Sequence, residues 1–447
     1  MNKSNRRLFL STTALGLASS PYIVAQARDR KYKTVLIGTG WWGMNILGEA
    51  MMSGRCHVTA LCDVDTRQLH PAVDQVEAKT GTRPKAYGDF RELLAKERPD
   101  ICIVATPDHW HPLITIAAVE IGAHVYVEKP ISHTILEGRA MVKAARAANR
   151  VVQVGTHRRV SPHNVSGYQF LTSGGAGKIG SVRAFVHYGG GPETPTPNQE
   201  VPKEIDWDMW CGPAPLRHYC DNFPQGGGRA IHPKGFRNYL DYANGTLGDW
   251  GIHWMDQIVW ILGEKAPKRV FSTGGRPIAG KPIYNPLEQT TDAPDHQVAT
   301  FEFENFTATW EHRRFAANNA EKGENVGCYF YGTKGTFHMG WRDGWRFYPS
   351  SKGQPVLHQA PTLHAPNSQN IRELWADFIE AIETGRRPAC DIEEIHYGTT
   401  LSLLGMLSYK LGRSVDWDGD AERVVGDPDA NRLLRREYRG EWEYPDA

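Results

Sequence analysis

Between residues 34 and 154, short apolar runs alternate with longer segments whose apolar residues recur at helical spacing. The apolar runs are 34–37, 58–62, 101–105, 124–127 and 151–154, and the helix-like segments include 45–52, 89–97, 112–121 and 134–148. Continuous apolar runs are typical of strands buried on both faces, and strands separated by helices form parallel sheets. The pattern therefore predicts a doubly wound α/β domain over residues 31–153.

The rest of the chain, residues 154–447, is predicted to form a second domain. Segments 189–202 and 224–235 are rich in proline and glycine, so we expect long loops there, which in a compact domain usually form a lid or a binding rim. A later segment is predicted to be an amphipathic helix, with apolar residues on one face at positions 252, 255, 259 and 262.

The first 27 residues have the pattern of an export signal. They contain no acidic residue, carry Arg6-Arg7 followed by a short apolar stretch, and end on Ala25-Gln26-Ala27. The apolar stretch is too short for a permanent membrane span. The arginine pair resembles the twin-arginine motif, which directs export of folded proteins, and an ordinary secretory signal is the alternative. We therefore expect residues 1–27 to be removed and the mature protein to be periplasmic or secreted.

The composition excludes several classes of function. Among 447 residues, 51 Lys and Arg nearly balance 50 Asp and Glu without a basic cluster, which argues against a nucleic-acid surface. The seven cysteines form no Cys-x-x-Cys pair, so neither a zinc knuckle nor a disulfide framework is indicated. After removal of the signal we expect no membrane association.

A glycine-rich turn joins the first predicted strand to the first helix. The sequence Gly38-Thr39-Gly40-Trp41-Trp42-Gly43 follows strand 34–37, and Asp63 closes the next strand. Such glycines let the backbone approach a pyrophosphate at a helix N-terminus, and the acidic residue accepts from a ribose 2′-hydroxyl. Because the charge of Asp63 repels a 2′-phosphate, NAD is predicted rather than NADP. The expected cofactor contacts here are Gly38, Gly40, Trp41, Trp42, Gly43 and Asp63.

Two further motifs lie at the carboxyl edge of the predicted sheet, Ala105-Thr106-Pro107 and Glu128-Lys129-Pro130. With residues 155–159, 248–253 and 332–336, they make the chain resemble the Gfo/Idh/MocA family of glucose-fructose oxidoreductase and inositol dehydrogenase. The resemblance implies an NAD(P)-dependent enzyme acting on a sugar, polyol or glycoside. It also implies a second α+β domain with an open, mostly antiparallel sheet, C-terminal helices that return to the first domain, and a homodimer or homotetramer. The cofactor contacts that it adds are Thr106, Pro107, His111, Glu128 and Lys129.

Oxidation of a secondary alcohol needs a base for the hydroxyl proton and a donor for the developing alkoxide. Asp249 and His253 are four residues apart, and we expect them on one helical face, with the carboxylate raising the basicity of the imidazole. His253 is the predicted base and Lys129 the predicted donor, and the family resemblance gives Lys129, Asp249 and His253 the same roles. As alternatives, Asp249 is a helix cap, His253 a structural histidine and Lys129 a solvated strand end.

Other residues are predicted to contact the substrate. They are His157 and Arg158, on the loop that enters the second domain, and Trp250, which lies beside Asp249. Eight of the 14 tryptophans lie between residues 207 and 345, and we expect Trp207, Trp210, Trp250 and Trp254 to stack on sugar rings. A metal site at His109 and His111, or at His253 and Asp256, is the less favoured interpretation, so no metal is predicted.

Export bears on the mechanism, because the periplasm holds little free nicotinamide cofactor. We expect NAD to be loaded before export, bound tightly and regenerated within the catalytic cycle. One route oxidises one sugar and reduces a second carbonyl compound. The alternative is a redox-neutral glycosidase, which oxidises a ring hydroxyl transiently, eliminates a leaving group, adds water and returns the hydride. The glycosidase route needs an additional acid/base near the sugar ring. Its candidates are His157, Tyr188, His232 and Lys234, and the sequence does not rank them. The remaining alternative is a non-catalytic sugar-binding module.

Overall fold

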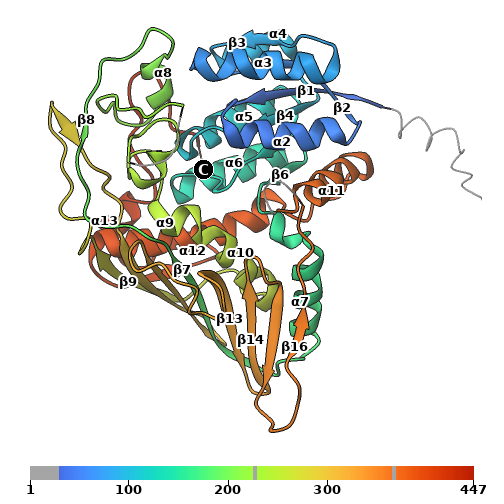
Figure 1. Cartoon of the computed structure of the whole chain (residues 1–447), viewed down its shortest axis with the longest axis vertical. Coiled ribbons are helices and arrows are strands. Elements are labelled where there is room, and N and C mark those ends of the chain that lie inside the picture. The colour runs from blue at the N-terminus through green and yellow to red at the C-terminus, as the bar shows by residue number, and fades with distance from the viewer. Residues whose placement is uncertain (1–29, 225–228, 365–368, 447) are drawn as a thin grey trace, which may run out of the picture.

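The computed structural model describes residues 30–224, 229–364 and 369–446, and two domains are evident in Figure 1. The predicted signal, residues 1–27, lies outside the described residues. The first domain contains a six-stranded parallel sheet in the order β3-β2-β1-β4-β5-β6. Its strands are β1 (Tyr32–Ile37), β2 (Cys56–Cys62), β3 (Lys85–Tyr87), β4 (Ile101–Val104), β5 (His124–Val127) and β6 (Val152–Val154).

Helices connect these strands and cover both faces of the sheet (Figure 1). They are α2 (Trp41–Met52), α3 (Thr66–Thr80), α4 (Phe90–Glu97), α5 (His111–Glu120) and α6 (Ile135–Ala147). Polar side chains start several of them: Asp65 accepts from Arg67 N before α3, and Asp89 accepts from Arg91 N before α4. The alternation of apolar strands and capped helices thus produces the predicted doubly wound domain.

The second domain is built on a ten-stranded sheet in the order β16-β15-β14-β13-β7-β12-β11-β9-β17-β18. All neighbouring strands are antiparallel except β12 and β7, so the predicted α+β class with an open, mostly antiparallel sheet is confirmed. The strands are β7 (Ile179–His187), β9 (Arg269–Gly275), β11 (His296–Glu302), β12 (Thr307–Arg313), β13 (Val326–Gly332), β14 (Gly335–Gly340), β15 (Trp345–Pro349), β16 (Leu357–Gln359), β17 (Val415–Asp418) and β18 (Arg423–Val424).

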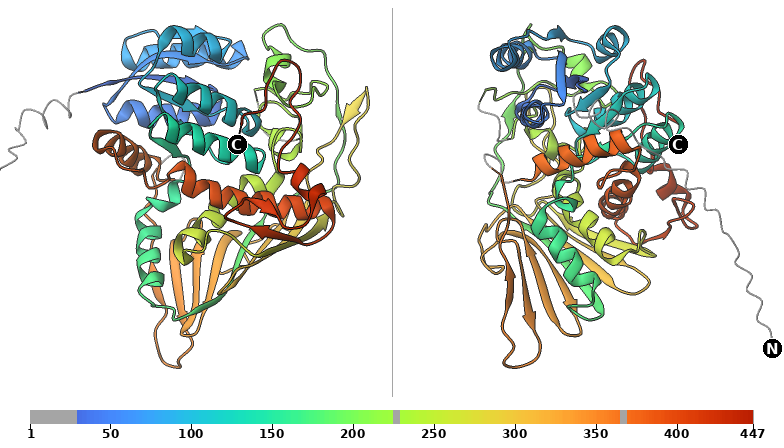
Figure 2. Two further views of the ribbon diagram at one scale, coloured as in Figure 1. Left: turned by 180° about the vertical axis from the view of Figure 1, so that it is seen from behind. Right: turned by 90° about the vertical axis from the view of Figure 1, so that its right-hand side faces the viewer.

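Helices of the second domain pack on one face of this sheet and between the domains (Figure 2). The helices are α7 (Pro162–Thr172), α8 (Trp207–Cys211), α9 (Gly245–Asp249), α10 (Gly251–Leu262), α11 (Ile371–Thr384), α12 (Ile392–Leu411) and α13 (Pro428–Arg432). The shorter elements are the 3₁₀ turns Asp108–Trp110, His157–Arg159 and Gly235–Asn238, and the two-stranded pair β8 (Thr196–Pro197) and β10 (Glu288–Gln289). Among the described residues, no helix is both long and apolar enough to cross a bilayer.

Two C-terminal helices join the domains. Leu374, Trp375 and Phe378 of α11 belong to the core of the first domain, whereas Leu401 and Leu404 of α12 belong to the core of the second. Each Å² of apolar surface buried between helix and domain contributes about 25 cal/mol of free energy, which stabilises the packing of the two domains. The two domains are therefore connected by a layer of helices that contributes to the cores of both.

A third apolar cluster lies over the edge of the first domain. It contains Trp207 and Trp210 of α8 together with Tyr219, Ile231 and Tyr242, and Val64 from the turn after β2 packs against it. Backbone hydrogen bonds from Thr66 N to Glu204 O (2.9 Å) and from Asp206 N to Val64 O (3.0 Å) join this layer to the first domain. The second domain consequently reaches past the sheet edge to the β2–α3 turn.

Candidate active site

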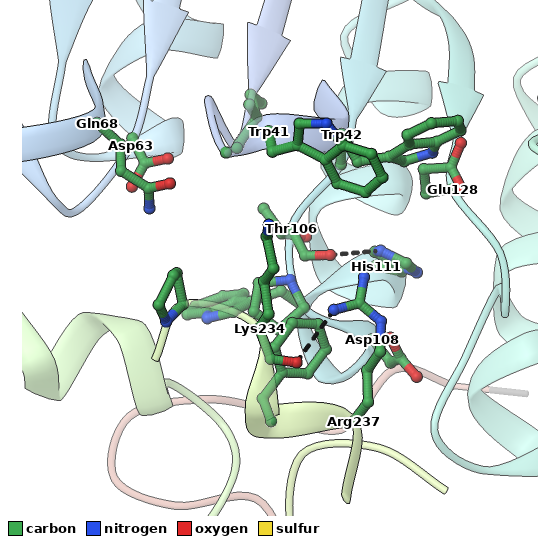
Figure 3. Close-up of a pocket in the computed structure, with 18 of the residues that line it drawn as sticks. Trp41, Trp42, Asp63, Gln68, Thr106, Asp108, His111, Glu128, Lys234 and Arg237 are labelled. Carbon is green, nitrogen blue, oxygen red and sulfur yellow. Dashed lines mark hydrogen bonds between the residues drawn. The ribbon is translucent and has the colours of Figure 1, made fainter. Parts of the chain in front are cut away.

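A cavity of about 390 Å³ lies between the two domains at the carboxyl edge of the parallel sheet. The first domain lines it with the glycine-rich turn and the ends of β2, β4 and β5, and the second domain lines it from η3 (Gly235–Asn238), α9 and α10. Figure 3 shows the side chains of both domains converging on this space. Ligands of doubly wound sheets bind at this edge.

The glycine-rich turn has the conformation that a dinucleotide requires. Gly38 has φ +94°, and a Cβ there would lie 2.6 Å from Ala105 O. A Cβ on Gly43 would lie 2.1 Å from Gly38 O, so only glycine lets α2 approach the turn this closely. Helix α2 begins at Trp41, so its free N–H groups lie beside the cavity. The helix starts four residues earlier than the predicted segment 45–52. The turn therefore fits a pyrophosphate.

Asp63 is fixed at the end of β2. Its Oδ2 accepts from Thr39 N (2.7 Å) and Thr39 Oγ1 (3.0 Å), and its Oδ1 accepts from Asp65 N (3.0 Å). Burial raises the pKa of Asp63, and these hydrogen bonds oppose the rise. Asp63 and Gln68 lie side by side at one end of the cavity (Figure 3), which fits the two hydroxyls of an adenosine ribose. The sequence analysis missed Gln68, because a helical glutamine carries no signal of its own.

Lys129 and Asp249 meet across the domain boundary. The Lys129 ammonium donates to Asp249 Oδ1 (2.6 Å) and to Asp249 O (2.9 Å), and Arg237 Nε lies 3.4 Å from the same Oδ1. Although burial opposes ionisation, Lys129 and Arg237 hold the pKa of Asp249 below its ordinary value. Asp249 is not a helix cap, since Trp250 occupies the cap position of α10. The cavity thus contains a carboxylate with two cations beside it.

His253 lines the same cavity, but Asp249 does not act on it as predicted. Asp249 ends α9 and His253 belongs to α10, so the two do not share one helical face. The carboxylate binds Lys129 instead, and burial together with Lys129 and His157 lowers the pKa of His253 well below its ordinary value. The predicted rise in basicity is therefore wrong. The imidazole is neutral, and its Nδ1 has no hydrogen-bond partner among the described residues.

Asp108 is a cavity residue that the sequence analysis missed. It begins the 3₁₀ turn after Thr106-Pro107 and is 5% exposed, and its Oδ2 has no partner among the described residues. Burial, reinforced by the Asp249 charge, raises the pKa of Asp108 to about 7. A carboxyl group that titrates near neutral pH in a cavity is a candidate acid/base. In the sequence Asp108 looks like any aspartate in a turn. Its raised pKa arises from burial and from the neighbouring Asp249, which only the folded structure brings close.

The other predicted cofactor contacts surround the same space. The side chain of His111 lies between Thr106 O (2.9 Å from Nε2) and Pro130 O (2.7 Å from Nδ1), and burial lowers its pKa to about 4. Glu128 Oε1 accepts from Tyr126 OH (3.2 Å), and burial raises the pKa of Glu128. Trp41, Trp42, Thr106, Pro107, His111, Glu128 and Lys129 all line the cavity.

The predicted substrate residues are divided by the structure. Trp250 lines the cavity, with its ring centroid 5.0 Å from that of Trp341, a further lining residue that the sequence analysis missed. His157 lies behind His253, with ring centroids 6.0 Å apart, and Arg158 is buried against Trp254 and Trp341. Neither His157 nor Arg158 is among the residues that line the cavity.

Two of the four tryptophans predicted to stack on sugar rings, Trp207 and Trp254, do not line the cavity, so the prediction is wrong for them. Trp254 is 0% exposed in the core of the second domain, so it cannot stack on a sugar. Trp207 is 5% exposed and stacks on Trp210 at 4.5 Å within the third cluster, and only Trp210 of this pair reaches the cavity. Periodicity shows that a residue is apolar but not which packed layer covers it.

No group of three or more potential metal ligands occurs among the described residues. Asp256 is bound by Arg159, with Nη2 2.7 Å from Oδ1, and His109 Nε2 contacts Trp210 O at 3.0 Å. Of the four side chains weighed as metal ligands, Asp256, His109 and His111 therefore have other partners.

Comparison with known proteins agrees with this geometry. A family model described as "Oxidoreductase family, NAD-binding Rossmann fold" matches residues 32–156, and one described as "Oxidoreductase family, C-terminal alpha/beta domain" matches 183–273 and 278–444. The chain belongs to the Gfo/Idh/MocA family of NAD-binding oxidoreductases. Its cofactor is NAD, as predicted.

Individual relatives are more distant. A glycosyl hydrolase family 109 protein of Stenotrophomonas maltophilia is 37% identical over 131 residues, 28% of this chain and 29% of the relative. The D-glucoside 3-dehydrogenase of Escherichia coli is 24% identical over 289 residues, 62% of this chain and 71% of the relative. A levoglucosan dehydrogenase solved with NADH and levoglucosan shares the fold, with TM-score 0.65 and 20% identity over 87% of this chain and 99% of that one.

Proposed function

We propose that the protein is a periplasmic oxidoreductase that oxidises a hydroxyl group of a sugar, polyol or glycoside and regenerates its bound NAD in each cycle. The observation that carries this proposal is the arrangement of Lys129, Asp249 and His253 around the cavity that the glycine-rich turn and Asp63 also line. The D-glucoside 3-dehydrogenase and the levoglucosan dehydrogenase, named for sugar substrates, support this substrate class.

The side chains divide the chemistry between them. Lys129 donates a hydrogen bond to the reacting hydroxyl and stabilises the alkoxide as it forms. Neutral His253 accepts the hydroxyl proton. Asp249, which also pairs with Arg237, fixes the position of the Lys129 ammonium. NAD, when bound, accepts the hydride from the carbon that carries the hydroxyl. Trp250 and Trp341 offer aromatic faces to the apolar side of the ring.

A glycosidase is the second candidate, and Asp108 is the observation that favours it. Elimination of a glycosidic group requires an acid near the leaving oxygen, and the carboxyl of Asp108 has its pKa raised to about 7 by burial. Among the four candidates left unranked, His232 binds Asp65 (2.9 Å) and the Lys234 ammonium lies over Trp41, so both lie toward the dinucleotide. The glycosyl hydrolase relative is consistent with this route.

Incubation of the purified protein with a panel of glycosides in deuterated water separates the candidates. Two distinct redox products without deuterium exchange favour the oxidoreductase. Net hydrolysis with deuterium at the carbon next to the oxidised one favours the glycosidase. Saturable sugar binding with neither product and no absorbance change would leave a non-catalytic binding module.

The export route is part of the proposal and has its own test. Conservative Arg6→Lys and Arg7→Lys changes together should leave the protein in the cytoplasmic fraction, because the twin-arginine route reads both guanidinium groups. Lys3→Gln, outside the pair, is the matched control. Unchanged export of the double variant would identify an ordinary secretory signal.

We also propose a homodimer or homotetramer, and light scattering of the exported protein measures its mass in solution.

A further inference from the structure

Lys234 of the second domain extends across the cavity toward the glycine-rich turn of the first (Figure 3). Its Nζ lies 5.0 Å from the ring centroid of Trp41, the first residue of α2. A cation within about 6 Å of an indole face is attracted to the ring. This contact brings an ammonium group from the opposite domain to the helix end where the dinucleotide turn lies.

Within the part of the chain that the structure describes, Lys234 differs from the other cavity cations in having no carboxylate partner. Three lysine and arginine side chains line the cavity, namely Lys129, Lys234 and Arg237. Lys129 lies 2.6 Å and Arg237 3.4 Å from Asp249 Oδ1, whereas no carboxylate of the described residues forms an ion pair with Lys234. A partly buried ammonium without a carboxylate is stabilised by an anion that enters the cavity.

The glycine-rich turn provides that anion site but no positive side chain. Residues 38–43 include no lysine, arginine or histidine, and the first turn of α2 has none either. The turn itself therefore offers a pyrophosphate backbone N–H groups and the helix dipole. The first domain also lines the cavity with Asp63 and Glu128, and its cavity lysine, Lys129, is paired with Asp249. Among the described residues, the cation beside the turn is Lys234 of the second domain.

Two side-chain contacts between the domains hold the second domain in this position. His232 Nε2 lies 2.9 Å from Asp65 Oδ2, and their side chains are 2% and 0% exposed. Arg67 Nη1 lies 2.8 Å from Asp221 Oδ2. Although burial opposes ionisation, hydrogen bonds from His232 and Arg67 lower the pKa of Asp65 to about 2. Since His232 is two residues before Lys234, this anchor fixes the backbone from which the ammonium extends.

We propose that Lys234 is a cofactor-binding residue that contacts the pyrophosphate of NAD, and that the His232–Asp65 and Arg67–Asp221 contacts delay release of the cofactor. The pyrophosphate contact requires only that the protein binds NAD. Retention of NAD between turnovers rests on the proposed function. Each half of the proposal is therefore measured without a sugar substrate, so that its failure is distinguishable from failure of the proposed activity.

The first test is equilibrium binding to protein stripped of cofactor. Lys234→Met keeps an unbranched side chain of similar length and removes the ammonium that lies over Trp41, and Lys203→Met is the matched control on an exposed lysine of the same domain. The ligands are NAD, ADP-ribose, which keeps the pyrophosphate, and adenosine, which lacks it. Loss of a charge-assisted hydrogen bond should weaken binding of NAD and ADP-ribose about tenfold or more.

Adenosine binding should stay unchanged in Lys234→Met and so report an intact site, and Lys234→Arg should restore most of the affinity for ADP-ribose. Unchanged affinity of Lys234→Met for NAD overturns the pyrophosphate contact. So does an equal loss for adenosine, because it would indicate general disruption.

The second test measures the dissociation rate of NADH in the presence of a competing ligand. Asp221→Asn removes the second-domain carboxylate that pairs with Arg67, which keeps its first-domain partner Asp65, and release of NADH should become several-fold faster. Asp74→Asn is the control, because Asp74 is on the same helix as Arg67 and pairs with the exposed Arg83 of the same domain. An unchanged rate in Asp221→Asn overturns the role of the Arg67–Asp221 contact in retention.

Discussion

The Lys129 ammonium lies 2.6 Å from the Asp249 carboxylate, and this ion pair joins the parallel-sheet domain to the second domain inside the cavity. Lys129 follows β5 and Asp249 ends α9, so the pair forms only when the two domains pack. In the proposed function, a substrate hydroxyl therefore meets a donor whose position is already fixed. Preorganised donors of this kind stabilise a developing alkoxide without reorganisation during the reaction.

Removal of the ammonium should therefore affect turnover far more than cofactor binding. In Lys129→Met we expect kcat to fall about a hundredfold or more, while the affinity for NAD changes little. Steady-state kinetics and NAD titration measure the two effects. Lys178→Met, on an exposed lysine remote from the cavity, is the control. Activity within a factor of about two of wild type would remove Lys129 from the catalytic assignment.

The buried imidazole predicts an unusual pH profile. Burial, Lys129 and His157 hold the pKa of His253 well below its ordinary value of about 6.5, so the imidazole stays neutral as the pH falls through 6.5. We expect the acid limb of kcat/KM to lie well below the ordinary histidine value and to disappear, with most of the activity, in His253→Ala. An acid limb at the ordinary histidine value would contradict this assignment.

Asp108 should have a signature that does not depend on activity. Its pKa is about 7 in the folded protein and about 3.9 in an unfolded chain, so the folded state binds the proton more tightly. Stability is then lost as the pH rises from about 4 to 7, and Asp108→Asn removes this loss. We expect the variant to gain roughly 2–4 °C in Tm at pH 8 relative to wild type and much less at pH 5.

If the glycosidase candidate holds, the same variant should also lose the alkaline limb of hydrolysis near pH 7, where Asp108 gives up its proton. Equal Tm changes at both pH values would show that the carboxyl group does not titrate as described.

Asp63 is expected to set the choice of nucleotide. Its carboxylate is held by Thr39 and by Asp65 N beside Gln68, where a 2′-phosphate would meet negative charge. Asp63→Asn should bind NAD more weakly and narrow the preference for NAD over NADP by about tenfold or more. Titration with both cofactors measures this, and an unchanged ratio would assign the discrimination to another residue.

Two tryptophans provide a matched pair for substrate recognition. Trp250→Ala removes a ring that lines the cavity and should raise KM several-fold with little loss of stability. Trp207→Ala removes a ring stacked in the third cluster and should cost about 3–5 kcal/mol of stability instead. Thermal unfolding and steady-state kinetics separate the two effects. If Trp207→Ala folds and raises KM while Trp250→Ala leaves KM unchanged, Trp207 and not Trp250 would be the residue that contacts the substrate.

Local patterns predicted the first domain well, because its strands and glycine turn are encoded in consecutive residues. The positions of Gly38, Gly43 and Asp63 follow directly from the strand–turn–helix order. The motif after β5 likewise located Lys129 at the edge of the sheet. Residues that act alone in the sequence, such as Asp108 and Gln68, join the site only because the domains pack there.

Long-range packing explains the predictions that were wrong. Asp249 and His253 have the spacing of one helical turn, but the helix is interrupted between α9 and α10. The Asp249 carboxylate instead pairs with Lys129 from the other domain. Trp254 lies beside His253 in sequence, yet its side chain faces the core. A spacing identifies neighbours within one helix and does not identify the partner that a second domain supplies.

In the proposed function, a sugar hydroxyl is oxidised by NAD that the protein already carries. The most direct measurement is the nicotinamide absorbance of the exported, purified protein, mixed with single sugars and glycosides without added cofactor. We expect at least one of them to produce the reduced-nicotinamide band, and a carbonyl acceptor or completion of hydrolysis to abolish it. Protein that contains NAD yet gives no absorbance change and no turnover with any member of a broad panel would contradict the account.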